Sequence, residues 1–203
     1  MTEGGLRPRL ATEADAAAIT STLSAAFDAD PLWSWAFPDD EKRPTQYQAF
    51  FSLFVESAIP NGWVWTIDQA AAVAVWTSPG KSELSEEAEA KIKPFLEDEL
   101  GAHAEAVLQV FESFEAACPD DVGFYYLSLL GTHPDHRGRG LGMELLGANL
   151  AQIDAESMPA YLESSNPANN TRYERLGFRP RTKFSTPEGR HTVTTMWREP
   201  SRG

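Results

Sequence analysis

The chain has 203 residues, which is the size of one domain and enough for a single hydrophobic core. It carries 17 lysines and arginines against 30 aspartates and glutamates, so the formal net charge at pH 7 is −13. This balance argues against nucleic acid and anionic membranes as partners, because both bind basic patches. It is compatible with cationic small molecules, which a negative field attracts. The single cysteine, Cys118, excludes an internal disulfide framework and a cysteine-based zinc site.

The first residues lack the long apolar stretch of a signal peptide. No run elsewhere approaches the roughly 20 apolar residues that a membrane helix needs. Repeats with periods of 20–50 residues are not evident either, which argues against solenoid folds. A single cytoplasmic domain spanning residues 1–203 is therefore the expectation.

The first eighty residues predict an alternation of strands and helices. Two segments have apolar residues at helical spacing, and three others are short and rich in β-branched and aromatic residues. In chain order we expect a strand over 6–11, a helix over 13–28, a helix over 41–59, and a hairpin of 63–67 with 70–77. Between the two helices, residues 29–40 are rich in proline and aspartate, and we expect them to form a loop.

The middle of the chain is strongly acidic and helical in composition. We expect residues 78–118 to form a solvated helical insertion over one edge of the core, within the same domain. Pro94 is expected to split the first helical stretch, since proline lacks a backbone donor and clashes with the preceding turn. The second stretch, 103–117, has one apolar face and is expected to be an amphipathic helix.

The remaining segments alternate between buried strands and helices. We expect a central strand over 124–132, a helix over 141–157, a buried strand over 160–164, a short helix over 169–176, and closing strands over 178–185 and 192–198. A strand–helix–strand unit inside a mostly β order is typical of a mixed sheet covered on both faces. The predicted fold class is therefore α/β, in the sense of α+β.

The loop between the central strand and the next helix carries the most chemical information. Glycines alternate at positions 138, 140 and 142, where they let the backbone approach a ligand and adopt positive φ. The first amides of the following helix lack internal acceptors and carry the positive end of the helix dipole. Arg137 and Arg139 add positive charge to an otherwise acidic chain. Together these features predict an anion site for a phosphate ligand that needs no metal.

Other readings of this loop fit less well. A Walker loop would end in Gly-Lys-Ser/Thr, and a dinucleotide fingerprint would need a third glycine at a spacing that is absent here. His133 and His136 lie three residues apart, but a metal would need further ligands at close range, so we expect no metal site. A simple glycine turn between strand and helix remains the structural alternative.

Two motifs in this half of the chain resemble the GNAT superfamily of N-acetyltransferases. Arg137-x-x-Gly140-x-Gly142 is similar to the superfamily signature that holds the pyrophosphate of acetyl-CoA, and Asn169 to Phe178 is similar to its closing segment. The two occur in the order and at the separation usual in the superfamily. Within it, segments along nearly the whole chain resemble the puromycin N-acetyltransferases: Arg9–Thr12, Ala70–Thr77, Gly140–Gly142, Pro159–Glu163, Tyr173–Phe178 and Pro187–Gly189. The segments between them differ, notably Trp33–Phe37 and the acidic stretch.

The resemblance implies a GNAT fold, with a mixed, twisted sheet of six to seven strands and a central strand pair that splays apart. It implies transfer of an acetyl group from acetyl-CoA, as co-substrate and without a metal, to a primary amine of a small molecule. The transfer would be a direct attack in a ternary complex, by a monomer or homodimer. The residues implied in acetyl-CoA binding are Leu130, Gly131, Thr132, Arg137, Gly138, Arg139, Gly140, Leu141, Gly142, Asn166, Asn169 and Tyr173.

Two residues are candidates for proton transfer. Tyr173 matches the position at which the family often places a general acid, and its alternative role is packing against CoA. Glu163 follows the second cleft strand, where a carboxylate can accept a proton directly or through water. The alternative for Glu163 is an ion pair with Arg172 or Arg175.

The acceptor pocket is expected near Trp33, Trp35 and Phe37, because aromatic residues in a loop suggest a binding wall. The alternative is that these rings seal the core. Two other functions stay open at this point. One is acetylation of a protein or peptide amine, and the other is an acyl-CoA-binding regulator without turnover.

Overall fold

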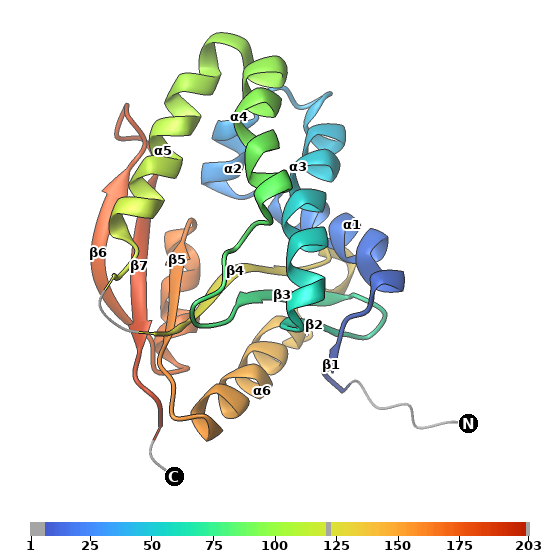
Figure 1. The fold of residues 1–203 in the computed structure, drawn as a ribbon, viewed down its shortest axis with the longest axis vertical. Helices are drawn as coiled ribbons and strands as arrows, with labels where there is room; N and C mark the ends of the chain where they lie inside the picture. The colour runs from blue at the N-terminus through green and yellow to red at the C-terminus, as the bar shows by residue number, and fades with distance from the viewer. Residues whose placement is uncertain (1–6, 121–122, 202–203) are drawn as a thin grey trace.

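The computed structural model describes residues 7–120 and 123–201, and its centre is one seven-stranded sheet with the order β1-β2-β3-β4-β5-β7-β6 (Figure 1). The strands are β1 (Arg9–Leu10), β2 (Val64–Ile67), β3 (Ala72–Thr77), β4 (Tyr125–Thr132), β5 (Ala160–Ser164), β6 (Arg179–Ser185) and β7 (Thr192–Arg198). In this described sheet β4 and β5 run parallel, and the other neighbouring strands run antiparallel. The predicted mixed sheet is confirmed.

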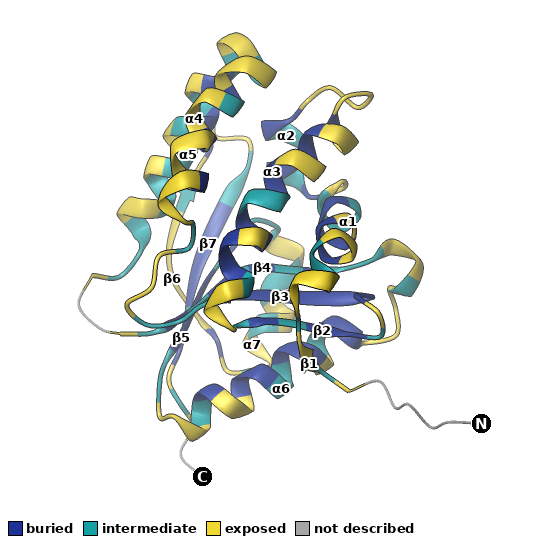
Figure 2. Ribbon diagram, turned by 45° about the vertical axis from the view of Figure 1, so that its right-hand side comes forward, coloured by how far each residue is buried: buried dark blue, intermediate teal, exposed yellow. Residues whose placement is uncertain are grey.

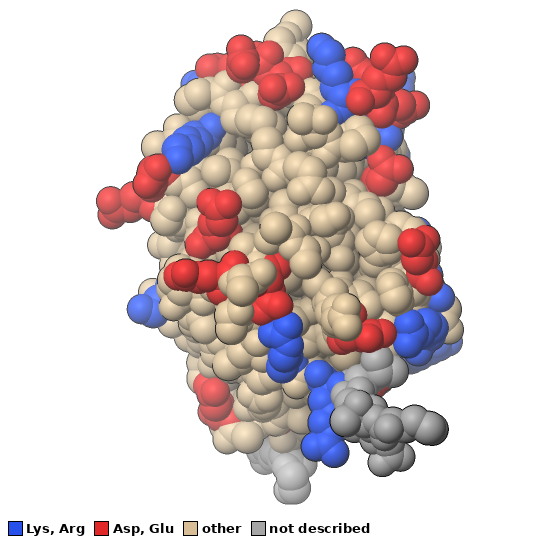
Figure 3. Space-filling model, turned by 90° about the vertical axis from the view of Figure 1, so that its right-hand side faces the viewer, with Lys and Arg blue, Asp and Glu red and all other residues tan. Residues whose placement is uncertain are grey.

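Helices cover both faces of the sheet. They are α1 (Ala16–Phe27), α2 (Pro31–Ala36), α3 (Arg43–Ala58), α4 (Glu86–Leu100), α5 (Ala104–Ala117), α6 (Leu141–Ala155) and α7 (Asn170–Glu174). One core cluster joins α1, α3, α4 and α5 to the upper face of β2, β3 and β4, and the other joins α6 to the opposite face. Figure 2 shows that α4 and α5 bury one side and expose the other. Acidic side chains lie in patches over the face shown in Figure 3, with basic side chains beside several of them.

A register shift in β4 moves its side chains from one core cluster to the other. Val75 of β3 pairs with Leu129, whereas the next residue, Trp76, pairs with Leu127, so Ser128 is the extra residue of a β-bulge. Leu127 consequently faces α6 while Leu129 faces α1 and α3. Ser128 thus marks the point at which the side chains of β4 change from facing α6 to facing α1 and α3.

At the same point β4 and β5 separate. Their parallel pairing covers only Tyr125–Leu127 with Ala160–Leu162. Beyond it, β4 stays paired with β3 as far as Thr132, while β5 stays paired with β7 through Glu163 and Ser164. The expected splayed strand pair is confirmed, and the edges of both strands that face the gap are left without a strand partner.

Two local predictions are wrong. Residues 29–40 are not a plain loop, because α2 begins at Pro31. Asp30 caps it by accepting hydrogen bonds from the amides of Leu32 and Trp33 at 3.0 and 3.2 Å. Pro94 does not split the acidic helical stretch, because α4 continues through it. Buried Ile92 and Leu96 anchor that turn against the core, which offsets the one backbone hydrogen bond that proline removes.

The other predicted elements lie within a few residues of their expected bounds. The hairpin turn is wider than Asp68-Gln69, since Ala70 also has a positive φ. Leu6, the expected start of the first strand, lies outside the described residues. None of the described helices combines the length and apolar character needed to cross a membrane.

An ion pair between buried Arg198 and half-buried Asp154 ties α6 to the end of β7. Arg198 donates from both terminal nitrogens to the two carboxylate oxygens of Asp154, each at 2.7 Å, and from Nε to the carbonyl of Leu176 at 2.8 Å. The pair holds the pKa of Asp154 below its ordinary value, because the guanidinium stabilises the charged carboxylate.

We predict that Asp154→Ala lowers the free energy of unfolding by about 3 kcal/mol, because it leaves a buried guanidinium without its partner. Urea titration at pH 7 measures this, and Asp98→Ala, at an exposed position on α4, is the control. Since the folded pKa is depressed, the contribution is present above about pH 4 and is lost as pH falls through the folded pKa. Equal stability of the two variants would contradict the assignment.

Candidate active site

Two cavities meet where β4 and β5 separate. The first is a groove of about 600 Å³, a size typical of ligand sites, between the end of α1, the end of β4, the glycine loop and α7. The second is a narrower pocket bounded by β4, β5, the α1–α2 corner and α5. Six residues line both cavities: Phe27, Asp30, Leu130, Asn166, Asn169 and Tyr173. A ligand in the groove and a ligand in the pocket would touch at this junction.

The glycine loop presents its backbone amides to the groove. Gly138 and Gly140 both have φ of +80°, and Gly140 caps α6 by accepting from the amides of Met143 and Glu144 with its carbonyl. Among the described residues, none accepts a hydrogen bond from the amides of residues 138–142. A run of unpartnered amides at the start of a 15-residue helix is a site for an anion.

Gly142 has a different role from the two glycines before it. A Cβ at this position would lie 2.7 Å from Oγ1 of Thr132, which is closer than real Cβ atoms approach. The absence of a side chain therefore lets α6 pack directly on the end of β4. Gly138 and Gly140, by contrast, have open space where a Cβ would point.

The two arginines of the loop point in different directions. Arg137 lines the groove and donates to the carbonyl of Ala26 at 2.9 Å. Arg139 does not line it, and instead contacts Nδ1 of His136 at 2.8 Å and Asp68 at 3.4 Å. Arg172, which sequence reasoning considered only as a partner for Glu163, does line the groove and donates to Asn169 at 3.1 Å. Two guanidinium groups, those of Arg137 and Arg172, therefore line the groove.

The remaining residues expected to bind acetyl-CoA also line the groove. Leu130, Gly131 and Thr132 present the unpaired edge of β4, and Leu141 and Gly142 open α6. Asn166 caps the following 3₁₀ turn by accepting from the amide of Ala168 at 3.0 Å. Its side chain and that of Asn169 are therefore already held in place at the junction.

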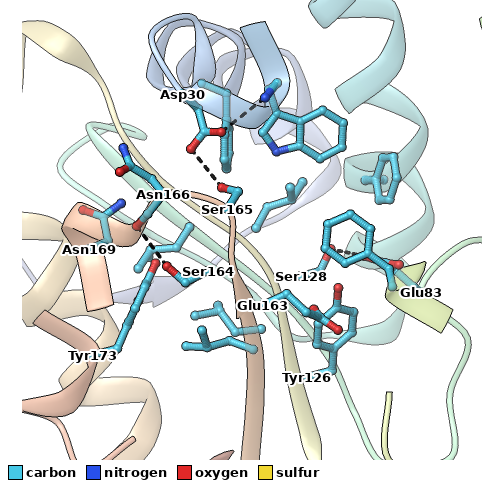
Figure 4. A pocket seen from close by; sticks show the side chains of 18 of the residues that line it. Asp30, Glu83, Tyr126, Ser128, Glu163, Ser164, Ser165, Asn166, Asn169 and Tyr173 are labelled. Atoms are coloured by element: carbon cyan, nitrogen blue, oxygen red, sulfur yellow. Dashed lines mark hydrogen bonds between the residues drawn. The ribbon is translucent and has the colours of Figure 1, made fainter. Parts of the chain in front are cut away.

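Tyr173 lies at the junction and its ring points into it from α7 (Figure 4). Burial raises its pKa to about 12, and the negative charge of Asp30 adds to the rise. The phenol therefore keeps its proton at neutral pH and can donate a hydrogen bond.

Glu163 faces the pocket from the end of β5. Desolvation among the pocket walls raises its pKa to about 8, although polar contacts with Tyr126 and Tyr161 offset part of the rise. Arg172 bonds to Asn169, and none of the ion pairs of the described residues includes Glu163. The alternative role of Glu163, as an ion-pair partner, is wrong. A carboxyl with a pKa near neutrality suits proton transfer.

Several residues that line the pocket were not predicted from the sequence. Asp30 is buried, and its second carboxylate oxygen accepts a hydrogen bond from Ser165 at 2.8 Å, which links the α1–α2 corner to the end of β5. Glu83 reaches the pocket from the segment before α4, and α5 contributes Phe111 and Phe114. Asp30-Pro31 is a recognisable cap followed by proline at N1, so that signal was available. No sequence pattern indicates that Glu83 lines the pocket, because its position depends on how residues 78–118 fold over the core.

The expected aromatic wall is present only in part. Trp33 lines the pocket, although it also belongs to the core cluster and only 9% of its surface is exposed. Trp35 faces away, where its indole donates to Glu188 at 3.1 Å and its ring lies against His103. Phe37 is fully buried between Tyr47 and Phe50. The pocket therefore takes its aromatic walls from Trp33, Phe27, Phe54, Phe111, Phe114 and Tyr126.

Comparison with known proteins agrees with this geometry. Residues 100–180 match the family described as the acetyltransferase (GNAT) domain. Mycothiol acetyltransferase of Corynebacterium aurimucosum is 35% identical over 81 residues, which cover 38% of this chain and 27% of that protein. The matched family segment holds β4, the glycine loop, β5 and α7, which supply most of the groove lining, and the α1–α2 corner outside the match supplies the rest.

Solved structures resemble the chain over almost its whole length. A Corynebacterium glutamicum protein described as histone acetyltransferase HPA2 and related acetyltransferase has a TM-score of 0.72 at 23% identity, with 98% of each chain covered. The polyamine N-acetyltransferase of Drosophila melanogaster has a TM-score of 0.67 at 14% identity, covering 96% of this chain and 100% of that one. Residues 100–180 thus match the GNAT acetyltransferase domain family, and the whole chain has the fold of the GNAT acetyltransferases.

Proposed function

We propose that the protein is an acetyl-CoA-dependent N-acetyltransferase that acts on a primary amine of a small molecule. The observation that carries the proposal is the junction at Tyr173, where an anion-binding groove meets a pocket lined by carboxylates. The Drosophila enzyme is described as forming N-acetylagmatine, the product of a small amine, which supports a small acceptor. The family match implies an acyl-CoA donor.

The groove suits acetyl-CoA on the grounds of its own chemistry. The amides of residues 138–142, with Arg137 beside them, would hold the pyrophosphate. The unpaired edge of β4, from Leu130 to Thr132, would bind the amides of pantetheine as a neighbouring strand does. The thioester would then lie at the junction.

Acetyl transfer then needs two proton movements. The neutral amine attacks the thioester carbonyl, a C–N bond forms, and the C–S bond breaks as CoA leaves. Glu163 would take the proton that the amine loses, directly or through water, and Tyr173 would protonate the departing thiolate. Binding both substrates at one junction removes much of the entropic cost of bringing them together.

The pocket is small as it stands. Its volume of about 100 Å³ is below the range of about 300–1,000 Å³ that is usual for ligand pockets. The reacting end of a small amine fits such a space, and so does the end of a peptide or lysine. A panel of polyamines, aminoacyl compounds including puromycin, and peptides, assayed by thiol release from acetyl-CoA, distinguishes these acceptors. Thiol release with none of them would favour a non-catalytic acyl-CoA-binding regulator.

The anion site can be tested at Gly140. We predict that Gly140→Asp weakens acetyl-CoA binding at least about 100-fold by calorimetry, since two unit charges about 4 Å apart repel by several kcal/mol near a protein surface. Gly62→Asp is the matched control, because Gly62 also has positive φ and open space but lies away from both cavities. Retention of wild-type affinity by folded Gly140→Asp would place the site elsewhere.

Tyr173 can be tested as the proton donor. We predict that Tyr173→Phe lowers kcat by about 10²–10⁴ while the Michaelis constant for acetyl-CoA changes little, because phenylalanine keeps the ring. The loss should shrink with a thioester whose leaving thiol is more acidic. An unchanged kcat, measured where chemistry limits the rate, would reduce Tyr173 to a packing residue.

Glu163 can be tested by the pH dependence of the reaction. A base must be ionised, so kcat/KM should rise with pH through the pKa of about 8 of this carboxyl. An acceptor whose amine stays neutral over the range isolates this titration. We predict that Glu163→Gln lowers kcat/KM by about 10²–10⁴ and removes the rise. The exposed-site control Glu112→Gln should retain both the rate and the rise, and a rise that persists in Glu163→Gln would assign the base elsewhere.

A further inference from the structure

Glu83 is a pocket residue that acetyl transfer as proposed does not use. It lies in the segment that links β3 to α4, far in sequence from the glycine loop, yet its carboxylate forms part of the pocket wall (Figure 4). It accepts a hydrogen bond from Oγ of Ser128, the bulge residue at which β4 and β5 separate. The side chain is thereby fixed at the base of the gap between the two strands.

The charge around Glu83 is unbalanced. The titratable groups that line the pocket are Glu83, Asp30, Glu163, Tyr126 and Tyr173, and no lysine, arginine or histidine is among the described lining residues. Asp30 is satisfied by its cap and by Ser165. Glu83 and Glu163 appear in none of the ion pairs of the described chain. Two half-buried carboxyl groups thus face one cavity without a protein cation beside them, so ionising them is costly unless a ligand supplies a positive charge.

The raised pKa values of Glu83 and Glu163 are consistent with carboxyl groups that lack a neighbouring cation. Desolvation raises the pKa of Glu83 to about 7, and the charge of Glu83 in turn adds to the raised pKa of Glu163. A bound cation would relieve both effects by favouring the ionised carboxylates. The neighbouring rings of Phe111 and Tyr126 can add cation–π attraction.

Position separates Glu83 from the reacting atoms. In Figure 4, Tyr173 and Glu83 lie on opposite sides of the pocket, and Glu163 lies between them. An acceptor whose amine reaches the junction would therefore extend its other end past Glu163 toward Glu83.

We propose that Glu83 is a specificity-determining residue that selects acceptors carrying a second positive charge, distant from the amine that reacts. This inference rests on the proposed function, and it names the acceptor class as diamines and related dications. The segment between β3 and α4 then has a role in recognition besides joining the insertion to the core.

The rival account is that Glu83 only fastens its segment to Ser128. A fastening role affects every acceptor alike, whereas charge recognition affects only those with a second cation. Glu83→Gln separates the two, because glutamine keeps an acceptor oxygen for Ser128 and removes the charge. Glu89→Gln, exposed on α4, makes the same change in net charge away from the pocket and serves as the control.

The test compares α,ω-diamines of increasing chain length with amino alcohols of the same lengths, at pH 8 and saturating acetyl-CoA. For the wild type we expect higher kcat/KM with the best diamine than with its amino alcohol. In Glu83→Gln we expect kcat/KM to fall roughly 10- to 100-fold for the diamine, as for a lost hydrogen bond to a charged group, and less than about threefold for the alcohol. Glu89→Gln should match the wild type.

Binding gives a second measurement that does not need turnover. Calorimetry of the best diamine with the CoA-loaded protein should show the same selective loss in Glu83→Gln, with affinity for CoA itself unchanged. Glu83→Asp, which keeps the charge on a shorter side chain, should move the preference to a longer diamine. Equal losses for diamine and amino alcohol, or no preference in the wild type, would overturn the inference. Diamine binding that depends on Glu83 without any thiol release would instead support it and overturn the proposed transferase activity.

Discussion

The separation of β4 from β5 is the constraint on which the site depends. Parallel strands normally stay paired because each backbone amide and carbonyl needs a partner. Here the pairing ends after Leu127 and Leu162, at the bulge of Ser128, while β3 and β7 hold the two strands along their outer edges. The gap therefore stays open without unravelling the sheet. It leaves one edge of β4 free for a ligand backbone and opens the space that Glu163 and Tyr173 both line.

Charge divides this space into two halves with opposite preferences. On one side, the amides of the glycine loop and the guanidinium groups of Arg137 and Arg172 form a positive surface within a chain of net charge −13. On the other side, the carboxyl groups of Asp30, Glu83 and Glu163 line the pocket and make it negative when they are ionised. A polyanionic donor and a cationic acceptor are each attracted to one half and repelled by the other. Under the proposed function, this arrangement would favour the donor in the groove and the acceptor in the pocket.

Sequence patterns predicted the parts of the fold that local chemistry determines. The bounds of β5 and β7 agree with the predicted strands over 160–164 and 192–198, and the glycines at 138 and 140 have the positive φ that the loop motif implied. The pattern failed where distant segments decide the outcome. Pro94 stays helical because of tertiary packing, Trp35 turns toward Glu188, and Glu83 enters the pocket through Ser128. These contacts join residues that are far apart in the sequence, so local patterns could not predict them. The aromatic residues of segment 29–40 indicated a pocket, but of Trp33, Trp35 and Phe37 only Trp33 lines it.

The central claim is that acetyl passes directly from donor to acceptor where the groove meets the pocket. The most direct test is an initial-rate study in which acetyl-CoA and the amine are both varied. Direct transfer requires both substrates to be bound together, so the account predicts double-reciprocal lines that intersect. Parallel lines, together with isolation of an acetylated enzyme after acetyl-CoA alone, would indicate a covalent intermediate and contradict it.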